Sequence, residues 1–276
     1  MGPVCLTVAD AARSLAFYRD AVGLAPLGER DGRVLLGVGG RELLSLIEEP
    51  GAQPSPTHTG LFHFALLVLE RIDLARWLVH ASQERVRLTG ASDHYVSEAV
   101  YLSDPDGHGI EIYWDRPREI WEGKVAGRMT TAPLDTGDLL AEVADPTAEA
   151  FAGLPDGTSI GHVHLKVASL SETVAFYRDV LGFELMAHFG AGAAFFGAGG
   201  YHHHIGANTW QSAGAPPPPP GSAALVHATI AIPGREDLDR LLTALDDAGH
   251  DLEDAPDGPA VRDPSGNALA LSAPER

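Results

Sequence analysis

Histidine is the residue best suited to do chemistry in this chain of 276 residues, which contains 13 of them. The densest group lies at residues 201–204, which read Tyr-His-His-His. A second pair, His162 and His164, is separated by one residue, so both side chains face the same side of a strand. Because its ordinary pKa lies near 6.5, imidazole can bind a divalent metal or move protons near neutral pH. The triple histidine is also typical of a surface patch that scavenges metal ions.

If residues 201–204 are extended, their side chains alternate between two faces. His202 and His204 then share one face, and Tyr201 and His203 share the other. Either face could present imidazoles to a substrate.

The elements around these residues repeat. The segment Leu-Ala-Phe-Tyr-Arg-Asp-Ala-Val-Gly-Leu at 15–24 returns as Val-Ala-Phe-Tyr-Arg-Asp-Val-Leu-Gly-Phe at 174–183. The turn-forming Asp-Pro-Asp-Gly at 104–107 returns as Asp-Pro-Ser-Gly at 263–266. Both pairs are offset by 159 residues, which indicates an internal duplication.

Each half contains two units made of one strand, one helix and further strands, which predicts an α+β fold of four modules. Asp10 and Ser169 are predicted to cap two of the helices, and Gly23, Gly182 and Gly249 to end three of them. Two helices show clear apolar faces, formed by Leu74, Trp77, Leu78 and Ala81 and by Leu238, Leu241, Leu242 and Leu245.

Domain boundaries follow the repeat. We predict an N-terminal pair of modules over 1–116 (1–55 and 59–116) and a C-terminal pair over 158–276 (158–213 and 222–273). Residues 117–157 are acidic and lack strand periodicity, which predicts a solvated linker with a short helix. Five prolines, Pro216–Pro220, predict a stiff connector between the third and fourth modules.

Composition excludes some partners. The formal net charge of −19 opposes binding to nucleic acid or to anionic membranes. No apolar run reaches the length of about 20 residues that a membrane helix needs. Cys5 is the single cysteine and no signal peptide is visible, so we expect a cytoplasmic protein.

The chain resembles the vicinal oxygen chelate superfamily, which includes glyoxalase I, bleomycin resistance proteins and extradiol dioxygenases. The resemblance is carried by residues 101–113 (Tyr-Leu-Ser-Asp-Pro-Asp-Gly-His-Gly-Ile-Glu-Ile-Tyr), 161–165 (Gly-His-Val-His-Leu) and 199–206 (Gly-Gly-Tyr-His-His-His-Ile-Gly). It is closest to bacterial catechol 2,3-dioxygenase-like proteins. It implies four βαβββ modules that pair into two open sheet barrels, with a metal in the cleft of a pair.

The resemblance also implies where metal ligands lie: on the first strand of each paired module and on the last strand of one. The corresponding residues here are Pro3, His63, His162 and His227 on first strands, and Glu111 and Ala270 on last strands. Pairing modules within a half leaves each site incomplete. Pairing the second module with the third gives a full set, His63, Glu111 and His162, while the first and fourth give a nearly bare site. The partners could meet within one chain or across a dimer.

Two histidines and one carboxylate form the facial triad of non-haem Fe(II) enzymes, with positions left open for a chelating diol and O₂. Mn, Zn and Ni accept the same donors, so the metal stays open. Considered separately, each residue also has a purely structural interpretation. His63 could be a buried core histidine, Glu111 a solvent-facing carboxylate, and His162 a surface residue.

By the same resemblance, nearby polar groups become candidates for acid–base and substrate-orienting roles. These candidates are His164, His202, His204, His94 and Tyr113. No binding site for an organic cofactor is predicted.

The resemblance and the predicted ligand set lead to two alternative predictions of function. The first is an Fe(II) extradiol dioxygenase that cleaves a catechol-type ring with O₂ in aromatic catabolism, as a homodimer by analogy. The alternative is a non-oxygenase metalloenzyme of the superfamily (an isomerase, lyase or transferase) or a drug-sequestering resistance protein.

Overall fold

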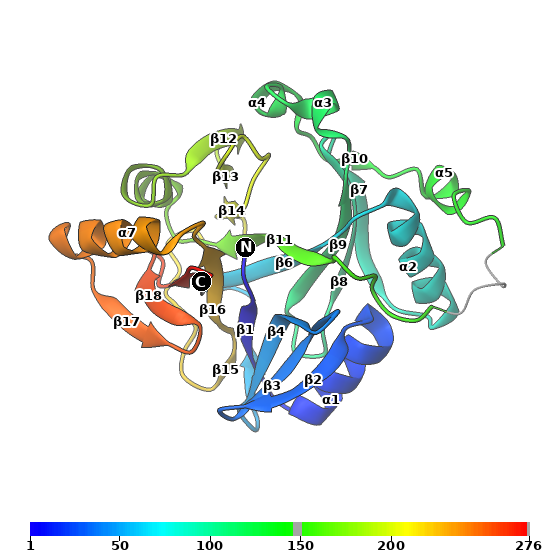
Figure 1. Cartoon of the computed structure of the whole chain (residues 1–276), viewed down its shortest axis with the longest axis horizontal. Helices are drawn as coiled ribbons and strands as arrows, with labels where there is room; N and C mark the ends of the chain where they lie inside the picture. Colours follow the sequence, from blue (N-terminus) through cyan, green and yellow to red (C-terminus); the bar gives the residue numbers. More distant parts are fainter. Residues whose placement is uncertain (146–150, 275–276) are drawn as a thin grey trace.

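The computed structural model describes residues 1–145 and 151–274, and it consists of two large curled sheets with helices against them (Figure 1). Residues 146–150 of the predicted linker and the last two residues lie outside the described part. Among the described residues, no helix is both long and apolar enough to cross a membrane.

The first sheet joins the first and fourth modules. Its strand order is β17 (Leu252–Ala255), β18 (Gly258–Arg262), β19 (Ala268–Ser272), β16 (Leu225–Ala231), β1 (Val4–Val8), β4 (Arg41–Glu48), β3 (Arg33–Val38) and β2 (Ala25–Arg30).

The second sheet joins the second and third modules. Its order is β10 (Ala132–Pro133), β7 (Leu88–Asp93), β8 (Ser97–Ser103), β9 (Gly109–Asp115), β6 (Gly60–Val68), β11 (Ser159–Lys166), β14 (Ile205–Asn208), β13 (Ala193–Gly197) and β12 (Glu184–Phe189). A small third sheet pairs β5 (Gln53–Pro54) with β15 (Ser222–Ala223).

The module pairing predicted from the ligand positions is therefore confirmed. In each large sheet the first strands of two modules run antiparallel at the centre, β1 beside β16 and β6 beside β11. Each first strand also lies parallel to the last strand of its own module, as β6 does to β9. Both large sheets thus take one module from each half of the chain.

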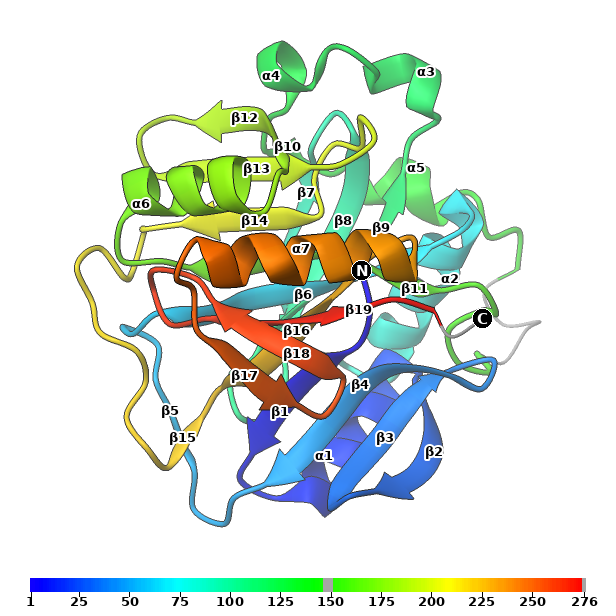
Figure 2. The same cartoon turned by 60° about the vertical axis from the view of Figure 1, so that its left-hand side comes forward.

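The helices also pack in pairs. The first pair is α1 (Ala11–Phe17), which continues as a π-helix over Tyr18–Val22, and α2 (Arg71–Gln83). The second pair is α6 (Leu170–Val174), which continues over Ala175–Val180, and α7 (Arg235–Asp247), and Figure 2 shows these two side by side. Trp77 of α2 donates its indole N–H to the carbonyl of Val22 at 3.1 Å, which ties the first pair together.

The predicted helix signals are mostly confirmed. Asp10 and Ser169 accept hydrogen bonds from backbone N–H groups three residues on, as N-terminal caps do. Gly23, Gly182 and Gly249 have positive φ angles at the helix ends. The predicted face of α2 is buried, whereas on α7 only Leu238 and Leu245 are fully buried.

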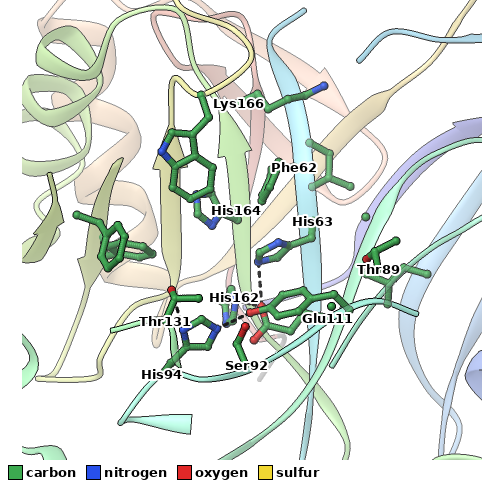
Figure 3. A pocket seen from close by; sticks show the side chains of 18 of the residues that line it. Phe62, His63, Thr89, Ser92, His94, Glu111, Thr131, His162, His164 and Lys166 are labelled. Carbon is green, nitrogen blue, oxygen red and sulfur yellow. Dashed lines mark hydrogen bonds and ion pairs between the residues drawn. The ribbon is translucent and has the colours of Figure 1, made fainter. Parts of the chain in front are cut away.

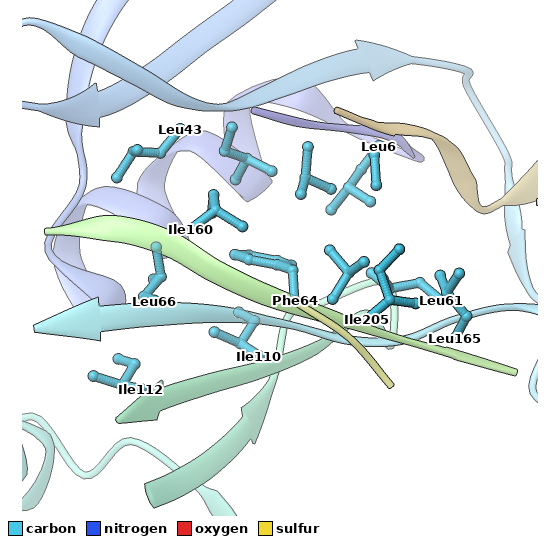
Figure 4. Close-up of a cluster of buried hydrophobic side chains, with 14 of the residues drawn as sticks. Leu6, Leu43, Leu61, Phe64, Leu66, Ile110, Ile112, Ile160, Leu165 and Ile205 are labelled. Carbon is cyan, nitrogen blue, oxygen red and sulfur yellow. The ribbon is translucent and has the colours of Figure 1, made fainter. Parts of the chain in front are cut away.

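The main core lies between the two large sheets (Figure 4). Leu6 and Leu43 from the first sheet face Phe64 and Ile110 from the second. Because side chains alternate along a strand, burial of Phe64 in this core turns its neighbour His63 to the opposite, concave face. The core thereby fixes the direction of the side chains that form the site.

The prediction of a solvated linker was wrong in part. The segment contains α3 (Arg118–Trp121), α4 (Val125–Arg128), β10 and α5 (Thr136–Leu140). Trp121, Val125 and Leu139 are buried, and β10 extends the second sheet by pairing with β7. Alternation was absent because the segment packs through isolated apolar residues rather than through one long strand.

Candidate metal centre

Three neighbouring strands of the second sheet bring together the three predicted ligands. His63 lies on β6, Glu111 on β9 and His162 on β11, and β6 is the middle strand. Nε2 of His63 and Nε2 of His162 lie 3.0 Å and 3.2 Å from the same oxygen, Oε2 of Glu111. Among the described residues, this is the group of three whose ligand atoms lie within 4.8 Å of one another. Figure 3 shows the three side chains converging from their strands.

The strand register explains the convergence. Ala65 on β6 is the cross-strand neighbour of both Glu111 and His162. Its methyl group leaves room between the carboxylate and the imidazole, while His63, two residues earlier on the same face, closes the third side. The set is complete within one chain, so a partner subunit is not needed to assemble it.

All three side chains are buried, with exposed fractions of 6% for His63 and 2% each for Glu111 and His162. Burial alone would raise the pKa of the Glu111 carboxyl, but its contacts with His162 and His63 outweigh burial and hold this pKa well below its ordinary value. Burial lowers the pKa of His162 despite the neighbouring carboxylate. The site thus favours an ionised carboxylate beside a neutral imidazole, the forms that bind metals.

One of the three converging ligand atoms lacks a hydrogen bond within the described part of the chain. Nε2 of His63 is buried and lies close to Glu111, yet it makes no hydrogen bond of acceptable geometry with any described residue. A buried polar atom without a partner costs free energy. A divalent cation placed among the two nitrogens and the carboxylate oxygen would satisfy it, so the donor set fits a metal of the Fe(II), Mn(II), Ni(II) or Zn(II) type.

The triad lines one part of a cavity of about 510 Å³. Its other walls include His94, Tyr101 and His164, and, from the linker, residues 129–131. This volume lies in the range of about 300–1,000 Å³ found for small-molecule sites. A substrate in this cavity would meet the triad together with His94, His164 and a third histidine, His203.

His94 and Tyr101 form a hydrogen-bonded pair in the cavity wall. Nδ1 of His94 lies 2.7 Å from the carbonyl oxygen of Thr130, and Nε2 lies 2.6 Å from the hydroxyl of Tyr101. Since a carbonyl only accepts, Nδ1 carries the hydrogen and Nε2 accepts the Tyr101 O–H. Burial, followed by the charge of Glu111, raises the pKa of Tyr101 well above its ordinary value.

His164 also faces the cavity, opposite His63 on the paired strands. Its ring centroid lies 5.0 Å from that of His63, and its Nε2 is buried with no hydrogen-bond partner among the residues that the structure describes. Burial lowers the pKa of His164 well below the ordinary value. This imidazole is therefore neutral at pH 7 and has a nitrogen available for a ligand.

The structure places three other predicted residues away from the cavity wall. The hydroxyl of Tyr113 contacts that of Tyr201 at 2.9 Å. His202 is held by Asp115 at 2.8 Å, and Nδ1 of His204 accepts the backbone N–H of Ala198 at 3.2 Å.

The predicted alternation over residues 201–204 was wrong, because this segment is not a strand. His203 is instead the member that reaches the cavity, with its ring centroid 4.2 Å from that of His162. Because an irregular backbone has no side-chain periodicity, the sequence pattern could not predict that the His203 side chain points into the cavity.

Tyr101 and the linker residues 129–131 also line the cavity, although the sequence did not indicate them. Tyr101 could have been found, because Glu111 and Tyr101 are cross-strand neighbours on β9 and β8. The position of the linker depends on tertiary packing, which no short pattern in the chain indicates.

The first sheet has a different group at the corresponding place. There His227 contacts Asp257 at 2.7 Å, and Arg33 donates to the same carboxylate at 3.2 Å. Pro3 and Ala270 occupy the other two ligand positions, as the sequence indicated. An ion pair thus lies where the second sheet has its triad.

Comparison with known proteins agrees with this architecture. The family model described as the glyoxalase/bleomycin resistance protein/dioxygenase superfamily matches residues 1–112 and 159–271. A catechol-2,3-dioxygenase of Bacillus subtilis (strain 168) is 41% identical over 274 residues, covering 97% of this chain and 95% of that protein.

Solved structures show the same fold. A putative dioxygenase from Bacillus subtilis superposes with a TM-score of 0.67 at 15% identity, over 99% of this chain and 85% of that chain. Glyoxalase I from Zea mays superposes with a TM-score of 0.60 at 17% identity, over 98% of this chain and 91% of that chain. Sequence, fold and module arrangement together show that the chain belongs to the glyoxalase/bleomycin resistance protein/dioxygenase superfamily.

Proposed function

We propose that this protein is an extradiol dioxygenase, which cleaves an aromatic ring beside two vicinal hydroxyl groups using O₂. One observation carries the proposal: two imidazole nitrogens and one carboxylate oxygen converge, buried, on a cavity that also contains His94 and His164. The identity of 41% to a catechol-2,3-dioxygenase supports the same reaction class.

In this proposal His63, Glu111 and His162 hold Fe(II). Bound there, Fe(II) would supply open coordination positions and the redox chemistry that allows O₂ to react with a diol. Both atoms of O₂ enter the ring-opened product. The diol supplies the electrons that reduce O₂, so no separate reductant is required.

The side chains of the cavity have separate roles. Tyr101 lies between Glu111 and His94, so its hydroxyl is placed to receive a proton from a diol hydroxyl and pass its own to Nε2 of His94. The carbonyl of Thr130 fixes the tautomer of His94 that can accept this proton. His164 approaches the cavity from the side of β11 and is placed to exchange a proton with the developing product.

Metal content and oxygen uptake test the proposal together. The protein should be purified anaerobically, its metals measured by mass spectrometry, and O₂ uptake followed with catechol after addition of Fe(II). We expect bound iron, one O₂ consumed per catechol and a yellow ring-fission product. Zinc or nickel without O₂ uptake would instead favour an isomerase, lyase or transferase that uses the metal as a Lewis acid. Retention of no metal under any condition would favour a sequestering protein.

A further inference from the structure

The cavity continues beyond the triad along β11. His162, His164 and Lys166 lie on the same face of this strand, and all three line the cavity. At about 3.3 Å per residue, the Cα atoms of His162 and Lys166 are roughly 13 Å apart. Figure 3 shows Lys166 and the triad at opposite ends, with Phe62 and His164 between them.

Lys166 is a buried side chain for which the described residues supply no counter-ion. Its exposed fraction is 8%, and its ammonium donates to the carbonyl oxygens of Ser55 at 3.3 Å and Pro56 at 3.1 Å. An ammonium has three hydrogens, so one remains for another acceptor. Over the described ranges 1–145 and 151–274, no carboxylate lies within ion-pair distance of this nitrogen.

Burial lowers the pKa of Lys166, which reflects the cost of an ammonium that is removed from water. Its two carbonyl contacts fix the position of the charge but do not neutralise it. A ligand carboxylate would do both, because charge-assisted hydrogen bonds in a buried site are among the strongest that proteins form.

The wall between the two ends is aromatic. The ring centroid of Phe62 lies 5.2 Å from that of His164 and 5.5 Å from that of Trp210. Trp210 is 53% exposed and lines the cavity, so an indole face is available to a ligand. Such a wall suits a flat ring followed by a short apolar chain.

We propose that the substrate is an aromatic vicinal diol with a carboxylate on a short side chain, and that Lys166 binds this carboxylate. This inference rests on the proposed dioxygenase function. With its hydroxyls at the triad, an unsubstituted ring leaves the Lys166 end of the cavity empty. A chain of two or three carbons extends the ligand toward that end. Lys166 would then determine specificity and take no part in ring opening.

Three catechols with side chains of similar length but different charge form the test: dihydrocaffeate, its methyl ester and dopamine. In the wild-type protein, kcat/KM should be at least about tenfold higher for the acid than for the ester, and lowest for the amine. In Lys166→Met, the acid-to-ester ratio should fall to within about threefold, mainly through KM. Lys166→Arg should keep most of the preference, since it keeps the charge.

The chain offers a matched control because it contains just two lysines. Lys124 is exposed and contacts the carbonyl of Ile120, so Lys124→Met should leave the acid-to-ester ratio unchanged. An acid-to-ester ratio near one in the wild-type protein, or a ratio that survives Lys166→Met, would overturn the inference.

A binding measurement on the wild-type protein tests the inference even if the Lys166 variants do not fold. Anaerobic titration of the wild-type protein, followed by tryptophan fluorescence, should show the acid binding at least about tenfold more tightly than the ester. Equal affinities would overturn the role of Lys166 even if rings are cleaved. Absence of O₂ uptake with every catechol would instead contradict the dioxygenase function, so the two failures are distinguishable.

Discussion

Nε2 of His94 accepts the hydroxyl of Tyr101 at 2.6 Å, and this pair lies in the cavity wall directly beside the triad. Strands β7 and β8 bring the two residues together across their hairpin, because His94 lies in the connection just after β7. The pair gives the cavity a proton acceptor that is not one of the proposed metal ligands.

Tyr101→Phe should therefore lower kcat by about 10²-fold, because general acid–base groups contribute on the order of 10²–10⁴ in rate. Metal content should not change, since the hydroxyl is not a ligand. Steady-state O₂ uptake with metal analysis of the same sample measures both.

Tyr113→Phe is the matched control for that variant. Tyr113 is a fully buried tyrosine of the same sheet, and its hydroxyl contacts Tyr201 outside the cavity. We expect a change in kcat of less than about threefold. A larger loss in Tyr113→Phe than in Tyr101→Phe would show that the proton path has been assigned to the wrong tyrosine.

Glu111→Gln should abolish stable metal binding, because it removes the one negative ligand of the set while keeping its shape. Metal retained after dialysis, measured by mass spectrometry, should fall from about one ion per chain to near zero, and O₂ uptake should be lost. Circular dichroism should show the fold retained.

A second buried glutamate provides the control. Glu98 lies on β8 and pairs with Arg71 and Arg116, with an exposed fraction of 5%. Glu98→Gln should lower the free energy of unfolding by about 2 kcal/mol, because it removes a charged acceptor from both arginines, while Arg71 keeps Asp138 and Arg116 keeps Asp93. Metal content should stay intact. Equal metal loss in both variants would mean that the measurement reports general destabilisation.

His204 should make stability depend on pH. Burial lowers its pKa to about 4, and its Nδ1 lone pair accepts the backbone N–H of Ala198, a bond that the protonated ring would lose. Because the unfolded chain takes up this proton near pH 6.5, the stabilisation is complete above that pH and is lost as pH falls toward 4. At pH 5, which is 1.5 units below 6.5, the loss is about 2 kcal/mol.

Urea unfolding at pH 7, 6 and 5 measures this loss in the wild-type protein and in His204→Gln. Other buried histidines contribute to both curves, so the difference between the curves isolates residue 204. The variant should lose about 2 kcal/mol less over this interval. Parallel curves would contradict the assignment.

Asp257→Asn should destabilise the first sheet without affecting the metal centre. Asp257 holds both Arg33 and His227, and Arg33 is 2% exposed, so the variant leaves a buried guanidinium without its counter-ion. We expect a loss of about 3 kcal/mol in the free energy of unfolding. Metal content per folded chain should be unchanged, and its loss would mean that the two sheets are energetically coupled.

The repeat predicted more of the fold than any single motif. It indicated four modules and, with the ligand positions, the exchange of module partners. The structure now gives a physical reason for two repeated motifs: Tyr18 donates to Asp104 at 2.9 Å, and Tyr177 donates to Asp263 at 3.2 Å. Each tyrosine belongs to one module and its aspartate to the next, so the motifs hold neighbouring modules together.

Other parts could not be predicted from local patterns. The direction of His203 depends on an irregular backbone, and the contribution of residues 129–131 depends on where β10 docks. Periodicity reports regular elements with one buried face, and neither segment is of that kind. The three predicted metal-ligand positions, by contrast, lie within regular strands, where alternation determines which face a side chain occupies.

The antiparallel contact between β6 and β11 has a consequence for how this protein has diverged. A gene for either half alone would encode an incomplete set of the proposed ligands, so under the proposed function selection for activity would act jointly on both copies of the duplicated sequence. The same exchange leaves Pro3 and Ala270 outside the proposed ligand set, and neither side chain could bind a metal. Under the proposed function, duplication supplied two half-sites for one reaction, and the first sheet holds an ion-pair group of Arg33, His227 and Asp257 in the corresponding place.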